Sequence, residues 1–206
     1  MDREFDVLVV GGGINGAGIA RDAAGRGLSV LMVEKDDLAC ATSSASSKLI
    51  HGGLRYLEQY EFRLVAEALA EREVLLRVAG HLVWPARFVM PHVPELRPRW
   101  MIRAGLFLYD HMSSRASLPG SKAVRLDVPP YNSGLQPGLK HGFIYSDCRV
   151  DDARLVIANT IDARARGARV LTRTECLAAR RHEGAWIATL SNGEEVNARA
   201  IVNAAG

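Results

Sequence analysis

The sequence is short of cysteine, aromatic residues and net charge, and each shortage argues against a class of protein. Its 206 residues include only three cysteines, Cys40, Cys148 and Cys176, in no CxxC spacing. Such an odd and sparse set argues against a structural metal site and indicates a reducing compartment. The 26 Lys and Arg against 23 Asp and Glu leave a net charge of +3. With aromatic residues at 6% and no base-stacking arrangement among them, nothing points to a nucleic-acid partner.

Long apolar runs are missing as well. No stretch approaches the roughly 20 apolar residues that a membrane-spanning helix needs. The first residues, Met1–Glu4, lead straight into a strand-like run, so no signal peptide is expected. The sequence therefore predicts a cytoplasmic protein, or one attached to the inner surface of the cell membrane.

Phe5–Glu34 has the pattern of a dinucleotide-binding βαβ unit. Asp6–Val10 is a short β-branched apolar run that predicts a buried strand, and glycines follow it at once. Ile14–Arg26 is rich in Ala and Gly and predicts a helix packed close to a sheet, and Ser29–Glu34 predicts the second strand. This order predicts an α/β, Rossmann-like fold with a parallel sheet.

The glycines between the first strand and the helix fit the pattern G-x-G-x-x-G, with Gly11, Gly13 and Gly16 at its three positions. The first permits a tight turn, the second lets the backbone approach a pyrophosphate, and the third lets helix and strand pack closely. Glu34 closes the second strand, where a carboxylate accepts a hydrogen bond from a ribose hydroxyl and favours FAD or NAD over NADP. The pattern predicts dinucleotide binding and leaves flavin and nicotinamide both open.

The rest of the sequence predicts alternating helices and strands. Helices are expected over Glu61–Ala79, over Pro98–His111, and from a cap at Asp151-Asp152 to Arg166. Strands are expected at Val83–Val93 (an edge strand, because of its prolines), Gly142–Val150, Arg169–Thr172, Cys176–Arg181, Ala185–Leu190, Glu195–Asn197 and Ala200–Gly206. Leu118–Lys140, which is rich in Pro and Gly, predicts a long loop with a short helix.

Two polar segments follow the second strand and carry groups suited to ligand binding. Thr42–Lys48 is a loop of hydroxyls and one amine near the crevice where doubly wound sheets bind ligands, although a solvated Ser-rich loop has the same composition. In His51–Tyr56, His51 and Arg55 are four residues apart, on one helical face. Arg forks two hydrogen bonds onto phosphate or carboxylate. A plain surface helix is the alternative explanation of Arg55 and Tyr56.

Four segments carry a family resemblance: Gly11–Gly18, Cys40–Lys48, His51–Tyr56 and Tyr145–Leu155. Together they resemble the FAD-dependent glycerol-3-phosphate dehydrogenases of the bacterial respiratory type, within the wider fold family of D-amino-acid oxidase. The resemblance runs over essentially the whole chain. Its most specific part is the run Ser46–Tyr56, because related amine oxidases lack it.

The resemblance implies FAD as the cofactor and a set of residues that contact it. The glycine turn and the acidic residue after the second strand bind the ADP part, and the hydroxyl loop lines the path to the flavin. The implied cofactor-binding residues are Gly11, Gly13, Ile14, Asn15, Gly16, Glu34, Lys35, Thr42, Ser43, Ser44, Ser47, Lys48, Gly52, Gly53, Cys176, Ala204, Ala205 and Gly206. No metal site is implied.

The resemblance also implies the reaction. Arg55 and Tyr56 contact the phosphate or glycerol end of sn-glycerol 3-phosphate, which loses hydride from C2 to the flavin and becomes dihydroxyacetone phosphate. Electrons then pass to a quinone. A base must take the hydroxyl proton. His51 is a candidate for that base, although a structural or flavin-contact role is favoured for it.

The family's proteins are more than twice as long as this chain, so the sequence resembles an N-terminal portion with little activity of its own. Residues 1–80 are predicted to form the FAD-binding core and its loop, 81–145 part of a substrate domain, and 146–206 a return to the FAD domain. A homodimer is compatible with the family. The open alternatives are a related flavin oxidase that uses oxygen and a non-catalytic nucleotide-binding module.

Arg97–Tyr109 mixes arginines with Trp, Met, Ile, Leu and Phe. Apolar residues with cationic neighbours suit a helix that lies on an anionic membrane surface. An amphipathic helix packed on its own domain has the same pattern. Both readings stay open on the sequence alone.

Overall fold

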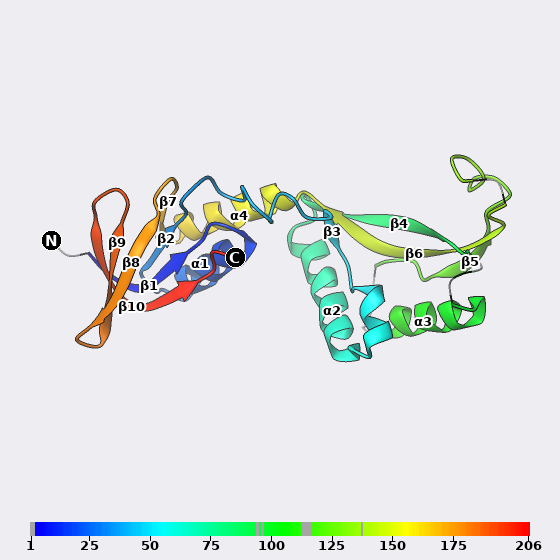
Figure 1. Cartoon of the computed structure of the whole chain (residues 1–206), viewed down its shortest axis with the longest axis horizontal. Helices are drawn as coiled ribbons and strands as arrows, with labels where there is room; N and C mark the ends of the chain where they lie inside the picture. The colour runs from blue at the N-terminus through cyan, green and yellow to red at the C-terminus, as the bar shows by residue number, and fades with distance from the viewer. Residues whose placement is uncertain (1–2, 94, 96, 113–116, 137) are drawn as a thin grey trace. The chain divides into compact units, whose positions relative to one another are not determined.

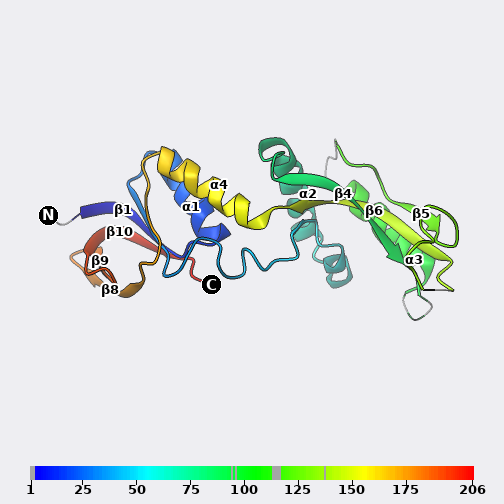
Figure 2. The same cartoon turned by 90° about the horizontal axis from the view of Figure 1, so that it is seen from above.

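The computed structural model describes residues 3–93, 95, 97–112, 117–136 and 138–206. The chain folds into two compact units (Figures 1 and 2). Unit 1 consists of Met1–Lys48 and Asp151–Gly206, and unit 2 consists of Leu49–Val150. The chain therefore leaves unit 1 after Lys48 and re-enters it at Asp151.

Unit 1 is built on a six-stranded sheet in the order β7-β2-β1-β10-β9-β8. Its strands are β1 (Arg3–Val10), β2 (Val30–Val33), β7 (Arg169–Leu171), β8 (Cys176–His182), β9 (Ala185–Leu190) and β10 (Glu195–Asn203). Strands β7, β2, β1 and β10 run parallel, whereas β9 and β8 continue the sheet antiparallel. The parallel, Rossmann-like sheet expected from the sequence is confirmed.

Two helices, α1 (Ile14–Gly25) and α4 (Asp152–Ala165), lie side by side in unit 1, as both views show. Alanines of α1 and α4 pack against Val9, Val30 and Met32 on one face of the sheet. Leu8, Leu31 and Val33 point to the other face, where they meet side chains of β9 and β10. The central strands are buried on both faces, which explains their nearly continuous apolar sequences.

Helix α4 begins and ends as its sequence predicts. The Asp151 carboxylate accepts a hydrogen bond from the backbone N–H of Arg154 at 3.1 Å and caps the first turn. After the helix, Gly167 takes a φ of +97°, a conformation that glycine adopts without the cost of a Cβ. The predicted cap and the predicted stop are both confirmed.

Unit 2 is built on an antiparallel sheet around β6 (His141–Val150). Strand β4 (Val83–Pro91) pairs along one edge of β6, and β3 (Leu49–Ile50) and β5 (Lys122–Arg125) pair with two separate parts of the other edge. Two helices, α2 (Phe62–Val78) and α3 (Arg99–His111), and the 3-10 helix η1 (Leu54–Gln59) complete the unit. They pack together through Val65, Leu69 and Tyr109.

The structure corrects three expectations about local structure. Leu118–Lys140 contains β5 and, in its described residues, no helix, because residues 122–125 find ladder partners on β6. Strand β10 is continuous where two short strands were expected, since pairing with β1 carries it through Ala198. His51 and Arg55 do not share a helical face, because Gly53 takes a φ of +71° and η1 begins only at Leu54.

The observed units also divide the chain differently from the predicted ranges, which ended at residues 80 and 145. Helix α2 belongs to unit 2, because Val65 and Leu69 bury their side chains against Tyr109 of α3. No helix in the described ranges combines the length and the apolar character needed to cross a bilayer.

Candidate functional site

The glycine turn of unit 1 leaves no room for side chains at two of its positions. Gly11 has a φ of +113°, and a Cβ there would overlap the carbonyl of Ala204. A Cβ on Gly16 would overlap the carbonyl oxygen of Gly11. Backbone packed this closely at the start of a helix is the arrangement that lets a pyrophosphate approach the helix N-terminus.

Glu34 lies against this turn, at the carboxyl end of β2. Its Oε2 accepts a hydrogen bond from the Gly12 N–H at 2.6 Å, and its Oε1 accepts one from the Asp36 N–H at 2.9 Å. The carboxylate is thereby fixed beside the turn and remains half-buried. This is the position from which an acidic residue reaches a ribose hydroxyl in dinucleotide-binding units.

The N-terminus of α1 has neither a side-chain cap, since Gly13 precedes it, nor an acidic residue in its first turn. Its first residue, Ile14, donates its N–H to the Ser43 hydroxyl at 2.9 Å. The helix dipole and the N–H groups therefore favour a negatively charged ligand, which fits the diphosphate of FAD.

The hydroxyl loop contains both exposed side chains and side chains engaged within unit 1. Ser43 contacts α1 as described, and Thr42 and Ser47 are exposed. Two further predicted cofactor contacts outside the loop, Asn15 and Lys35, are also exposed. Lys48, in contrast, places its Nζ 2.7 Å from Asp152 Oδ1 and 2.9 Å from the Ser44 carbonyl. These hydrogen bonds from Lys48 and from Ser46 lower the pKa of the Asp152 carboxyl to about 2.

The last residues of the chain complete the surroundings of the turn. Ala204 donates its N–H to the Val10 carbonyl at 2.8 Å, and the Ala205 N–H is bound by the Asn203 side chain. The exposed Gly206 follows. Cys176 packs on the apolar cluster of β1, β2 and β9, and burial raises the pKa of its thiol. Thr174, which the sequence did not single out, donates its N–H to the Glu34 carbonyl at 2.8 Å.

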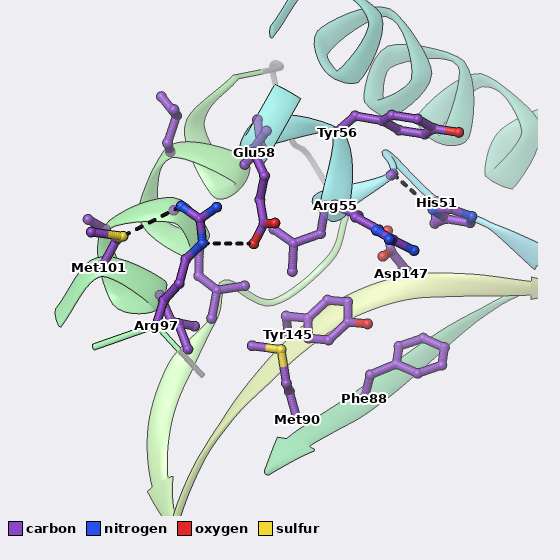
Figure 3. Close-up of a pocket in the computed structure, with 18 of the residues that line it drawn as sticks. His51, Arg55, Tyr56, Glu58, Phe88, Met90, Arg97, Met101, Tyr145 and Asp147 are labelled. Atoms are coloured by element: carbon purple, nitrogen blue, oxygen red, sulfur yellow. Dashed lines mark hydrogen bonds and ion pairs between the residues drawn. The ribbon is translucent and has the colours of Figure 1, made fainter. Parts of the chain in front are cut away.

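Unit 2 contains a cavity of about 800 Å³, shown in Figure 3. His51, Arg55 and Tyr56 line it together; Arg55 and Tyr56 are on η1, and His51 precedes that helix. The other lining side chains are mostly apolar and come from β4, β6, η1 and α3; they include Leu54, Leu57, Phe88, Met90, Met101, Ile102, Leu106, Leu108 and Tyr145.

Two features give this cavity its polar character. Arg55 is exposed and has no ion-pair partner within the described residues, so its guanidinium is available to an anion. Arg97, also on the wall, lies 3.3 Å from a carboxylate oxygen of Glu58 and is partly neutralised (Figure 3). A cavity of this kind fits a small ligand with one anionic end.

A hydrogen bond from the backbone of Gly53 holds the imidazole of His51 in place. Gly53 donates its N–H to His51 Nδ1 at 2.9 Å. A neutral imidazole that accepts at Nδ1 carries its proton on Nε2. In this arrangement His51 presents a hydrogen-bond donor at Nε2, which favours an orienting role over removal of a proton.

A buried polar network adjoins the cavity and reaches its wall at Asp147, and the sequence analysis missed it. Arg72 of α2 pairs with Asp147 of β6 at 2.7 Å, and the Tyr109 hydroxyl of α3 donates to both carboxylate oxygens, at 2.9 and 3.0 Å. All three side chains are at most 3% exposed. Asp147 lies within Tyr145–Leu155, one of the four segments that carry the family resemblance, and this was the signal in the sequence that could have pointed to the network.

Burial governs the titration of this network. It raises the pKa of the Asp147 carboxyl, while the hydrogen bonds from Arg72 and Tyr109 pull that pKa down. Burial and then the Asp147 charge raise the pKa of the Tyr109 hydroxyl, which therefore stays protonated. Burial likewise raises the pKa of the neighbouring Cys148 thiol to about 11, which makes it unreactive.

Comparison with known proteins identifies the family of the chain. Residues 6–206 match the family described as FAD dependent oxidoreductase. The chain is 63% identical to the aerobic glycerol-3-phosphate dehydrogenase of Escherichia coli (strain K12), over 98% of this chain and 40% of the relative. It is 57% identical to the D-erythritol 1-phosphate dehydrogenase of Brucella abortus (strain 2308), over 98% of this chain and 41% of the relative.

Among solved structures, the glycerol-3-phosphate dehydrogenase of Bacillus halodurans complexed with FAD is similar with a TM-score of 0.64 and 29% identity. The similarity covers 98% of this chain and 34% of that one. The chain thus spans about 40% of the length of the curated relatives that it matches. The fold class and the FAD cofactor expected from the sequence are both confirmed.

Proposed function

Because the chain belongs to the family of FAD-dependent oxidoreductases, we propose that it supplies the FAD-binding part and a portion of the substrate-binding part of a dehydrogenase for sn-glycerol 3-phosphate. The observation that carries this proposal is the 63% identity to the Escherichia coli enzyme over 98% of the chain. The matched region includes both the glycine turn and the residues that line the cavity of unit 2.

In unit 1, the backbone of the glycine turn and the α1 N-terminus would hold the diphosphate of FAD, and Glu34 would accept a hydrogen bond from the adenosine ribose. Bound FAD supplies a two-electron acceptor for hydride. The exposed hydroxyls of Thr42 and Ser47 and the backbone of Ala204 and Ala205 would then contact the remainder of the cofactor. Lys48 would act through Asp152, to which its charge is already committed.

In unit 2, Arg55 would bind the phosphate of the substrate through paired N–H donors, with Tyr56 beside it. The apolar walls of the cavity would lower the local dielectric and strengthen that charge interaction. Oxidation removes a hydride from C2 and a proton from the hydroxyl oxygen, so a proton acceptor is needed. His51 would orient the oxygen through its Nε2 proton, which leaves the acceptor to another group.

Electron transfer to a quinone and attachment to the cytoplasmic membrane surface are the further parts of the proposal. Helix α3 supports the attachment, because Trp100 is 70% exposed and Phe107 is 56% exposed. Arg99 is exposed next to Trp100. Such a helix suits an anionic membrane surface. Arg103 is not part of this surface, since it is half-buried and donates to the Ser121 hydroxyl.

A second candidate is oxidation of D-erythritol 1-phosphate, which the 57% identical Brucella abortus relative supports. Both candidates share a phosphate ester and a secondary alcohol, so the same arginine serves either. They differ in chain length, which the cavity volume accommodates in both cases.

The decisive experiment uses the complete protein, purified with its flavin and studied without oxygen. We expect glycerol 3-phosphate to bleach the visible flavin band and unphosphorylated glycerol to leave it unchanged. Bleaching by D-erythritol 1-phosphate at a higher kcat/KM would favour the second candidate. A flavin that neither phosphate ester reduces would overturn the proposed function.

A further inference from the structure

The turn His51–Gly53 is held by a hydrogen bond to a residue far outside its own segment. The N–H of Gly52 donates to the hydroxyl oxygen of Tyr109 at 2.8 Å. Tyr109 lies on α3, far along the sequence, and its own proton goes to the Asp147 carboxylate on β6. One hydroxyl thus connects the turn to a second and a third element of unit 2.

The charge of this connection is balanced inside the unit. Arg72 of α2 pairs with Asp147 at 2.7 Å and donates a further hydrogen bond to the Ser146 carbonyl at 3.3 Å. Both charged groups are almost fully buried, so solvent does not screen the interaction between them. The two carboxylate oxygens of Asp147 accept hydrogen bonds from Arg72 and Tyr109. The Tyr109 hydroxyl oxygen therefore remains free to accept the hydrogen bond from the Gly52 N–H.

Packing removes the remaining freedom of the turn. A Cβ on Gly52 would lie 2.5 Å from a methyl carbon of Leu69 and 2.8 Å from the Tyr109 oxygen. Gly53 follows with a φ of +71° and binds His51 Nδ1 through its N–H. The turn therefore sits directly against Leu69 and Tyr109, and His51 is tied to the turn.

We propose that Tyr109, Asp147 and Arg72 form a positioning relay that fixes the His51–Gly53 turn, and through it His51 and Arg55, on the wall of the unit 2 cavity. The three are positioning residues, because Tyr109 and Arg72 do not line the cavity, and Asp147, which is on its wall, has both carboxylate oxygens engaged by them. The inference rests on the proposed function, since it assigns a role in that same substrate site.

The test replaces Tyr109 by Phe in the complete flavoprotein, which keeps the ring packed on Val65 and Leu69 and removes only the hydroxyl. We expect kcat per bound flavin to fall roughly 10- to 100-fold, as misplaced binding groups cost about this much. The flavin content should stay unchanged. A buried pair that only stabilises the fold would lower Tm and leave kcat per bound flavin unaltered, so a kcat within about two-fold of the parent overturns the relay.

The matched control is Tyr131→Phe, because Tyr131 is half-buried and its hydroxyl has no hydrogen-bond partner in the described part of the chain. Combining Tyr109→Phe with Asp147→Asn tests the connection. Groups that act as one relay give a double variant no worse than the poorer single variant. Losses that multiply would contradict the relay even if both single variants are impaired.

The outcome for the proposed function is read separately. If the unaltered protein reduces its flavin with neither phosphate ester, the proposed function fails, and amide hydrogen exchange then tests the relay. Peptides that cover residues 49–59 should exchange faster in Tyr109→Phe than in Tyr131→Phe. Equal exchange in the two variants would overturn the relay on structural grounds.

Discussion

Unit 1 and unit 2 hold their functional groups by different means. In unit 1 the groups are backbone N–H donors and one carboxylate at the ends of parallel strands, and close packing of glycines positions them. In unit 2 the groups are side chains on a turn and a 3-10 helix, and a buried ion pair with a tyrosine positions them. A site made of backbone tolerates no added atoms, whereas a site made of side chains depends on distant partners.

The largest effect should come from breaking the ion pair of unit 2. Arg72→Met leaves the Asp147 carboxylate buried without its cation, which costs about 3–5 kcal/mol of unfolding free energy. Urea denaturation measures it. The matched control is Arg77→Met on the exposed face of the same helix, which should change stability by less than about 0.5 kcal/mol.

The same variant should have a characteristic pH dependence. Loss of Arg72 removes a group that lowers the pKa of Asp147, so this pKa rises further above the ordinary value of 3.8. The folded state then binds a proton that the unfolded state releases, and stability falls as the pH rises above 3.8. A penalty of equal size at acidic and neutral pH would show that packing, and not charge, is lost.

A smaller effect is expected from adding one methyl group to the glycine turn of unit 1. Gly16→Ala forces a Cβ against the Gly11 carbonyl, which should cost about 2–3 kcal/mol and release FAD. The ratio of flavin absorbance to protein measures the release. The matched control is Gly18→Ala, two residues further along α1, where an added Cβ meets open space. It should stabilise the helix by up to about 1 kcal/mol. Equal flavin retention in the two variants would contradict the claim that close packing at Gly16 holds the turn.

The surface of α3 tests whether unit 2 has a second role. Replacing Arg99 by Gln and Trp100 by Ser in the complete protein should weaken sedimentation with anionic vesicles about 5- to 30-fold, at ~1 kcal/mol for the cation and a similar amount for the indole. Vesicles of neutral lipid are the control for the charge. Unchanged sedimentation with anionic vesicles would contradict membrane attachment through this helix.

The smallest effect concerns the contact between Lys48 and Asp152 in unit 1. Because Lys48 is about half exposed, Lys48→Met should cost ~1 kcal/mol or less. Asp152 has a depressed pKa in the folded state, so this stabilisation is present above pH 3.8 and is lost as the pH falls toward about 2. Urea unfolding of both proteins from neutral to acidic pH measures the closing gap. A gap that persists at the acidic end would assign the effect to packing of the lysine stem.

The two units also differ in how far the sequence predicted them. In unit 1 the sequence located β1, β2 and α1, because a buried parallel strand, a glycine turn and an alanine-rich helix each have a local signature, although it divided β10 into two strands. In unit 2, β5 was missed, since Lys122–Arg125 has no strand pattern of its own and forms only by pairing with β6. The relay was missed because Arg72, Tyr109 and Asp147 are far apart in sequence.

By itself, the sequence predicted a dinucleotide turn at Gly11–Gly16 with Glu34, and its family resemblance implied FAD, which the comparisons confirm. These features depend on neighbours within a few residues, or on motifs whose spacing is fixed by the backbone. Only the tertiary structure decided that Lys48 is committed to Asp152 and that Tyr109 holds Gly52. Both are contacts between segments distant in sequence, and a hydrogen bond of that kind leaves no pattern along the chain.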